Sequence, residues 1–586
     1  MSEHETHGSG SPEGASSSTH ALLARAQGAL LPLAGVVVAT IALSSFPAVS
    51  QMDSHKGRLG LAAVAIVLFA FLAKVRANAT LRPIAFTLLA MASTYGVFNY
   101  YQFDHRVFTT TGDTADATFY YLNGKYFDEL GYFRLYEAVL VADDEGEGKF
   151  RKIARYRDLV AYKDILPRAV AIARADDVKA HFTPERWAAF SHDVAHLARI
   201  STQNWSYFFI DHGYNPPPPW TFVGGTLAKL CPVEKLKWIT SVDIALIAIL
   251  MALIAWAFGV EAMFAALLFF VVTFSGRWPI VGQSLLRFDW FFGLVASVCF
   301  AKKGHHGKAG FALLYAAMNR VFPAAFGVAA AIFFVRDLVK TRTLSSEMRR
   351  FTLGAAVAVV VIGGGALVTQ GIDAYRESAA NLALHGGPES YSSHRVGLGD
   401  AVLFRGEIER GPNIEQKIEQ LHALSPVFRL IALAVLALLA VVVWRSRAPL
   451  SSWIWIGAFP VFILTNPQIN YFHFRMLFVL LHVDALLRFA RVDDDRDDDR
   501  EDGRAAHTTD DDSVDPLVAK VARAWHALAI AGLFVVEVAT QSAMVTGANR
   551  YFVTCVTSFG MLAYLVCALA FVSWRALRAH RATQAA

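Results

Sequence analysis

The sequence predicts an all-α, polytopic transmembrane helical bundle with large extracytoplasmic loops. Hydrophobic residues make up 55% of the 586 residues and charged residues only 18%, a more apolar balance than that of ordinary soluble proteins. The apolar residues gather in runs of roughly 18 residues or more, each long enough to cross a hydrocarbon core of about 30 Å as a helix. These continuous runs also exclude a strand barrel, in which apolar and polar residues would alternate.

The apolar runs predict three spans before residue 102, a central group and two further spans near the C-terminus. The expected spans are 29–49, 59–74, 83–101, 238–258, 263–274, 288–300, 352–368, 427–444, 453–464, 472–487, 524–545 and 552–574. The apolar stretch 311–335 is interrupted by Asn319-Arg-Val-Phe-Pro323. Because proline and polar groups are tolerated inside a bundle where water or protein covers them, this interruption predicts two short helices that enter and return.

The basic connections between spans predict the orientation in the membrane. Lys and Arg gather in 74–82, 302–308, 336–350 and 575–581. All four segments fall on one side of the bundle if the amino terminus is cytoplasmic, and short basic loops favour the cytoplasmic side. We therefore expect a multi-pass protein of a bacterial plasma membrane with both termini inside and its site on the extracytoplasmic face.

The spans divide the chain into nine parts. In order, these are a disordered cytoplasmic tail (1–28), three spans (29–101), a large extracytoplasmic loop (102–237), a bundle with a broken helix pair (238–368), a second extracytoplasmic loop (369–425), more spans (426–489), an acidic cytoplasmic linker (490–520), two spans (521–574) and a basic cytoplasmic tail (575–586). The acidic run 493–502 looks like the paired-aspartate metal motif of soluble nucleotide-sugar transferases. Because it lies on the expected inside, opposite the candidate site, we interpret it as a solvated linker and predict neither a metal nor a cofactor.

The first extracytoplasmic loop carries the most chemistry. It opens with Asp104, Asp113 and Asp116 just beyond a membrane exit, beside aromatic residues that favour the interface. Its middle part, 151–199, has apolar residues at helical spacing, including Ile165 and Phe190, which predicts helices along the membrane surface. Four consecutive prolines, 216–219, predict a stiff extended strap at its end.

Several short motifs follow one another in a characteristic order. They are Asp116-Ala-Thr-Phe-Tyr-Tyr121, Gly131-Tyr-Phe-Arg-Leu-Tyr136, Tyr214-Asn-Pro-Pro-Pro-Pro219, Asn319-Arg-Val-Phe-Pro323 and Asn466-Pro-Gln-Ile-Asn-Tyr-Phe-His473. This series resembles the GT-C superfamily of membrane glycosyltransferases, and most of all its polyprenyl-phosphate-mannose-dependent mannosyltransferase branch. That branch usually has Lys before the broken-helix proline, whereas in this chain the basic residue, Arg320, lies earlier.

The resemblance implies a hexosyltransferase that acts with inversion. The donor would be a polyprenyl-phosphate sugar, with mannose as one candidate for the hexose, and the acceptor a glycan or glycolipid outside the membrane. Membrane lipids would be the other partners, and no nucleic acid is expected.

Such a transfer needs one carboxylate to take the acceptor proton and cations to stabilise the departing phosphate. Asp116 is the first candidate base and Asp113 the second. The candidate phosphate partners, all expected on the outer side, are Arg277, Arg287, Arg320, His473 and Arg475. The further candidate substrate-binding residues are Tyr120, Tyr121, Tyr214, Asp289 and Tyr471.

Plainer interpretations stand beside these. Asp116 would also serve as the N-cap of a surface helix, the arginines as interfacial residues that extend toward water, and Asp289 as an ion-pair partner of Arg287. A transporter or flippase of a lipid or solute is the main alternative function, and a silent membrane scaffold a third. The absence of an obvious internal repeat and the size of the outer loops favour the enzyme.

Overall fold

The prediction of an all-α, multi-pass membrane protein is confirmed. The computed structural model describes residues 30–75, 78, 81–108, 112–161, 164–201, 205–278, 283–501 and 516–585, and it is 79% helix and 2% strand. Eight helices of the described chain are long and apolar enough to cross a membrane. The expected tail 1–28 and residues 502–515 of the expected acidic linker lie outside the described residues.

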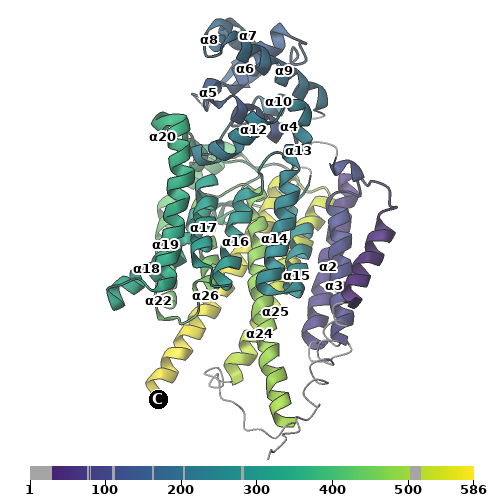
Figure 1. The fold of residues 1–586 in the computed structure, drawn as a ribbon, viewed down its shortest axis with the longest axis vertical. Coiled ribbons are helices and arrows are strands. Elements are labelled where there is room, and N and C mark those ends of the chain that lie inside the picture. The colour runs from purple at the N-terminus through teal and green to yellow at the C-terminus, as the bar shows by residue number, and fades with distance from the viewer. Residues whose placement is uncertain are drawn as a thin grey trace, which may run out of the picture.

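The helical bundle is formed by the chain on either side of the first large loop (Figure 1). Its main helices are 30–43, α2 (Gln51–Val75), α3 (Leu81–Tyr100), α14 (Val242–Phe258), α15 (Val260–Val272), α16 (Asp289–Lys302), α17 (His306–Asn319), α18 (Val328–Thr341), α19 (Ser346–Ala358), α20 (Gly364–Gly386), α22 (Ile414–Arg445), α24 (Met476–Glu501), α25 (Pro516–Val545) and α26 (Arg550–Ala585). Shorter elements complete it: η5 (Phe274–Gly276), η6 (Phe322–Gly327), η7 (Val359–Gly363), η8 (Pro388–Ser390), α21 (Leu398–Leu403), η9 (Leu450–Ser452), η10 (Ile454–Gly457), α23 (Ala458–Pro460), η11 (Val461–Thr465) and η12 (Ile469–Arg475).

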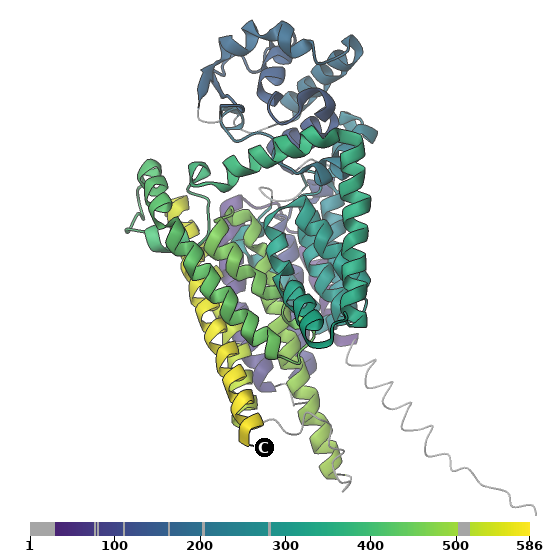
Figure 2. The same cartoon turned by 90° about the vertical axis from the view of Figure 1, so that its left-hand side faces the viewer.

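The chain from 102 to 237 forms a separate layer at one end of the bundle, opposite the end that holds the C-terminus (Figures 1 and 2). We call this layer the loop domain. Its elements are η1 (His105–Phe108), α4 (Thr114–Ala117), η2 (Thr118–Asn123), α5 (Phe127–Leu130), α6 (Leu135–Glu145), β1 (Arg155–Arg157), β2 (Ile165–Pro167), α7 (Arg168–Ala173), α8 (Ala175–Lys179), α9 (Pro184–Ile200), α10 (Trp205–Phe208), α11 (Pro218–Trp220), η3 (Thr221–Gly225), α12 (Thr226–Leu230), η4 (Val233–Lys235) and α13 (Leu236–Thr240).

The expectation that the middle of this loop lies along the membrane surface is wrong. Phe190 and Val194 of α9 are buried in a hydrophobic core built mostly from loop-domain residues, to which Leu285, Leu286 and Ala374 also belong. Ile165 belongs to β2, which pairs antiparallel with β1, and is not helical. The apolar face of α9 therefore packs against protein and not against lipid. An amphipathic pattern alone does not distinguish these two cases, because a protein core and a membrane surface both bury an apolar face.

The proline run also differs from the expected strap. Only Pro216 and Pro217 are extended, while Pro218 and Pro219 begin the helix α11. Proline fits the first turn of a helix because its missing N–H would have no intrahelical partner there.

Helices α16 and α17 of the central bundle are short, with 14 residues each. At 1.5 Å per residue each is about 21 Å long, less than a hydrocarbon core of about 30 Å. Helix α17 ends at Asn319, Arg320 is extended, and the chain becomes helical again at Phe322. The ends of both short helices therefore place polar groups below the loop domain.

Helix α20 turns sharply inside its length. Gly371 has a φ of +77°, which glycine adopts without strain, and it separates a part that runs along the bundle from a part that crosses its end under the loop domain (Figure 2). The expected second loop, 369–425, is therefore helical to Gly386, and α22 already begins at Ile414. Helix α24 likewise continues through 490–501, which we had assigned to the linker.

The expected orientation is tested by labelling single cysteines, in a chain whose four native cysteines are replaced by serine. We predict that Ala180→Cys, exposed on the loop domain, reacts with a membrane-impermeant maleimide in intact cells. Ser346→Cys, at the exposed start of α19, should react only after permeabilisation, because it lies among the basic loops. The reverse pattern of labelling would contradict the orientation.

Candidate functional site

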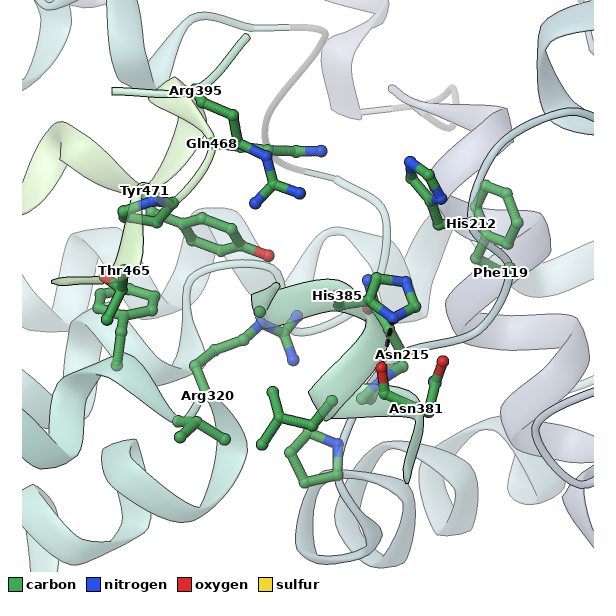
Figure 3. Close-up of a pocket in the computed structure, with 18 of the residues that line it drawn as sticks. Phe119, His212, Asn215, Arg320, Asn381, His385, Arg395, Thr465, Gln468 and Tyr471 are labelled. Atoms are coloured by element: carbon green, nitrogen blue, oxygen red, sulfur yellow. Dashed lines mark hydrogen bonds between the residues drawn. The ribbon is translucent and has the colours of Figure 1, made fainter. Parts of the chain in front are cut away.

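A cavity of about 540 Å³ lies where the loop domain meets the bundle. Its wall combines the start of the loop domain, the segment 211–217, the connection before α16, the break between α17 and η6, the crossing part of α20 and the turn 464–471. Figure 3 shows Arg320, Tyr471, His385 and Arg395 around it. The cavity unites five residues that the sequence proposed: Asp116, Tyr120, Arg287, Arg320 and Tyr471.

Asp116 lies in the first turn of α4 and faces this cavity. The preceding Asp113 is the N-cap, and its Oδ1 accepts hydrogen bonds from the backbone N–H groups of Ala115 (3.0 Å) and Asp116 (3.1 Å). Asp113 does not line the cavity. Burial, and then the negative charge of Asp116, raise the pKa of Asp113 to about 7. Asp113 thus holds Asp116 in place.

The carboxylate of Asp116 pairs with Arg287 from the bundle. Asp116 Oδ2 lies 2.9 Å from Arg287 Nε, and both side chains are largely buried. The pair has the distance of an ion pair but not the alignment of a hydrogen bond, and Oδ2 has no hydrogen-bond donor in the described structure. Oδ2 is therefore held by charge while it keeps a lone pair that can accept a proton.

Asp243, near the start of α14, fixes the backbone that carries Arg287. Its Oδ1 accepts hydrogen bonds from the N–H groups of Arg287 (2.7 Å) and Phe288 (3.2 Å). We did not single out this residue from the sequence. A carboxylate at the start of an otherwise apolar span was the signal that could have identified it, because such groups are costly to keep near hydrocarbon.

Two guanidinium groups converge on one phenol. Arg287 donates a hydrogen bond to the Tyr120 hydroxyl, and Arg320 donates another at 3.1 Å. Arg320 also donates to the carbonyl of Asn319 (2.9 Å), while its Nε has no partner among the described residues. Since Asp116 is the only carboxylate paired with either arginine in the described structure, this part of the cavity wall has an excess of positive charge suited to an oxyanion.

Asp289 does not pair with Arg287, so that plainer interpretation is wrong. Its Oδ2 accepts hydrogen bonds from Asn319 Nδ2 (2.8 Å) and the Tyr315 hydroxyl (3.3 Å). Asp289 therefore connects the first turn of α16 to the end of α17. It fixes the break from which Arg320 extends, and it lines a second, apolar cavity instead of the first.

Two of the candidate tyrosines belong to the loop domain core. The Tyr121 hydroxyl donates to the carbonyl of Cys231 (2.6 Å), and the Tyr214 hydroxyl shares a hydrogen bond of 2.7 Å with Thr221. Both rings are fully buried and neither lines the cavity. Their contribution is to the packing that supports the cavity wall.

Three candidate cations also lie away from the cavity. His473 donates through Nδ1 to the carbonyl of Asn470 (2.7 Å), and its ring is enclosed by aromatic side chains. Arg475 forms a fully buried ion pair with Glu537 of α25 at 2.5 Å. Arg277 lies over the ring of Phe274. None of the three lines the cavity that Asp116 faces.

Residues that no sequence motif indicated complete the opposite wall. His212 and His385 face each other with ring centroids 5.5 Å apart, and His385 Nδ1 donates to the carbonyl of Asn381 (2.8 Å; Figure 3). Burial, and then the neighbouring His385 and Arg157, lower the pKa of His212 to about 3, so it is neutral at physiological pH. These groups come from segments far apart in the sequence, which is why no local pattern revealed them.

Comparisons of the chain with protein-family models, with curated proteins and with solved structures give no match. The chemistry of the site therefore rests on its own geometry. That geometry comprises a carboxylate with an available lone pair, two buried arginines beside it and a polar wall opposite.

The ion pair predicts energetic coupling between the two parts of the molecule. Asp116→Asn and Arg287→Gln each leave one buried charge without its partner, whereas the double variant removes both charges. We expect the double variant to be less destabilised than the sum of the single variants, with a coupling energy of about 1–3 kcal/mol. Thermal unfolding of the four proteins in detergent measures this coupling, and additive effects would show that the pair is not formed.

The raised pKa of Asp113 predicts a pH-dependent stability. Because the pKa in the folded protein lies above the ordinary value of 3.8, the acid form favours the fold, and this contribution is lost as pH rises through about 7. Asp113→Asn keeps the N-cap oxygen but cannot ionise. We expect the wild type to lose thermal stability relative to Asp113→Asn as the pH rises from about 4 to about 7, the range between the ordinary and the raised pKa, with little further loss above it. Parallel pH profiles would contradict this assignment.

Proposed function

We propose that the protein is an inverting membrane glycosyltransferase that moves a hexose, with mannose as one candidate, from a polyprenyl phosphate to a glycan or glycolipid on the extracytoplasmic side. The observation that carries the proposal is the convergence of Asp116, Arg287 and Arg320 on one cavity at the end of a membrane bundle. A base for an acceptor hydroxyl and cations for a phosphate are the two groups that this transfer requires.

In the proposed reaction the acceptor hydroxyl donates its proton to Asp116 Oδ2. The acceptor oxygen forms a bond to the anomeric carbon of the donor sugar while the bond from that carbon to the phosphate oxygen breaks. The electron pair leaves with the polyprenyl phosphate, which gains one negative charge. Arg287 and Arg320 stabilise that charge as it develops, and a single displacement of this kind inverts the anomeric carbon.

The cavity lies where a lipid-linked donor in the membrane and an acceptor outside the membrane could both reach it. Its volume of about 540 Å³ lies within the range of small-ligand sites. The bundle below would hold a lipid-linked donor, whose phosphate reaches the two arginines. The neutral His212, together with Asn381 and His385 on the opposite wall, offers hydrogen-bonding groups for acceptor hydroxyls.

The Asp116→Asn variant tests this function. Asn keeps the shape of Asp but cannot take a proton at neutral pH, so transfer should fall about a hundred- to ten-thousand-fold while the protein remains folded. The measurement follows radiolabelled sugar from a polyprenyl-phosphate donor into a glycan or glycolipid in membranes that contain each variant.

Asp104→Asn is the matched control, because Asp104 lies in the same segment, pairs with the exposed Arg106 and does not line the cavity. We expect this control to retain activity. Full activity of Asp116→Asn would show that Asp116 is not the base. A wild type that moves a lipid or solute across the membrane but transfers no sugar would favour the transporter over the glycosyltransferase.

A further inference from the structure

Two buried arginines lie at the loop-domain end of the bundle, outside the cavity described above. Arg58 is on the second turn of α2 and has 1% of its surface exposed, and Arg277 follows η5 with 5% exposed. Tyr100 links the two arginines: its carbonyl accepts a hydrogen bond from Arg58, and its hydroxyl donates to the carbonyl of Gly276 (2.6 Å), the residue before Arg277. Helix α2 and the segment after η5 thus bring two positive charges to the same part of the bundle.

Arg58 has few partners for its five N–H groups. Nη2 donates to the carbonyl of Tyr100, with 3.4 Å between nitrogen and oxygen, and the guanidinium lies 5.5 Å from the Tyr100 ring centroid. Its Nε and Nη1 have no hydrogen-bond partner among the described residues. A buried guanidinium with unsatisfied donors is costly unless an acceptor reaches it.

Arg277 has a similar environment. It donates to the carbonyl of Phe274 at 3.1 Å and lies 4.0 Å from the centroid of that ring. Within the described chain, no carboxylate lies at ion-pair distance from Arg277 or from Arg58. The charge of each arginine is therefore met only by carbonyls and aromatic faces.

Glu537 of α25 is a buried carboxylate in the same part of the bundle, but other groups already bind both of its oxygens. Its oxygens accept from Arg475 (2.5 Å), from the Thr273 hydroxyl (3.1 Å) and from the N–H of Phe274 (2.9 Å). Glu537 thus pairs with Arg475 and acts on Arg58 only at longer range. It leaves Nε and Nη1 of Arg58 without an acceptor, and Arg277 without a carboxylate at ion-pair distance, among the described residues. Uncompensated charge of one sign inside a membrane protein indicates a bound ion of the opposite sign or an ion pathway.

We propose that Arg58 and Arg277 form a second oxyanion site that binds a phosphate group. Guanidinium groups match the oxygens of phosphate in geometry, and the open Nε and Nη1 of Arg58 supply the donors. The site is distinct from the first cavity, because neither arginine lines it.

The phosphate group could belong to a membrane phospholipid or to inorganic phosphate, and the test separates these sources. The full chain, freed of lipid in a neutral detergent, is heated with phosphatidylglycerol, with diacylglycerol of the same chains, or with inorganic phosphate against chloride at equal ionic strength. We expect at least one phosphate-bearing probe to raise the Tm by about 2 °C or more, and diacylglycerol to have no effect. A response to phosphatidylglycerol alone identifies the lipid headgroup as the ligand.

Variants of single residues test whether the rise in Tm comes from phosphate bound at Arg58 and Arg277. Arg58→Gln and Arg277→Gln should lose it. Lys56→Gln should keep the shift, because Lys56 lies two residues before Arg58 in α2 but is exposed and pairs with Asp53. Arg320→Gln should also keep the shift, which separates this site from the proposed donor site.

Two results would overturn the proposal. One is a wild type that responds to no phosphate-bearing probe, which decides the matter even if the variants do not fold. The other is a shift that persists in Arg277→Gln or Arg58→Gln but disappears in Arg320→Gln, which would assign all phosphate binding to the first cavity.

Discussion

The site depends on one ion pair that joins the two layers of the molecule. Asp116 comes from the loop domain and Arg287 from the bundle, and their contact closes the interface at the cavity. Each partner is braced on its own side, Asp116 by the N-cap Asp113 and Arg287 by Asp243. Because a largely buried charge is costly without its partner, this pair helps to hold the loop domain against the bundle. It does so beside hydrogen bonds from Asn381 to the carbonyl of Tyr214 (3.0 Å) and from Gln370 to that of Pro218 (3.0 Å).

Apolar run length predicted the multi-pass character of the chain but gave twelve spans, whereas eight helices of the described chain are long and apolar enough to cross a membrane. Asp116, Arg287 and Arg320, all expected on the outer side, line one cavity. The sequence did not show which of Tyr120 and Tyr121 faces the cavity. Consecutive helical residues point about 100° apart, so Tyr120 faces the arginines while Tyr121 faces the core of the loop domain. Which of two adjacent tyrosines faces a cavity depends on the packing of the whole element.

Long-range partners explain the other misplaced residues. Arg475 was a candidate phosphate partner because it is expected at a membrane entry on the outer side, yet Glu537 from a distant span pairs with it. The amphipathic pattern of α9 gave the correct secondary structure but not what its apolar face contacts, which is the core of the loop domain. In both cases the contact partner comes from a distant part of the chain, which local sequence patterns do not describe.

The central claim is that a lipid phosphate binds between Arg287 and Arg320 beside Asp116. A cryo-electron microscopy structure of the protein with an added polyprenyl phosphate tests it most directly. The account predicts phosphate density within hydrogen-bond distance of both guanidinium groups, about 2.7–2.9 Å from nitrogen to oxygen, with Asp116 facing the space above it. Phosphate bound elsewhere, with Arg287 and Arg320 still joined only to Tyr120 and Asp116, would contradict the account.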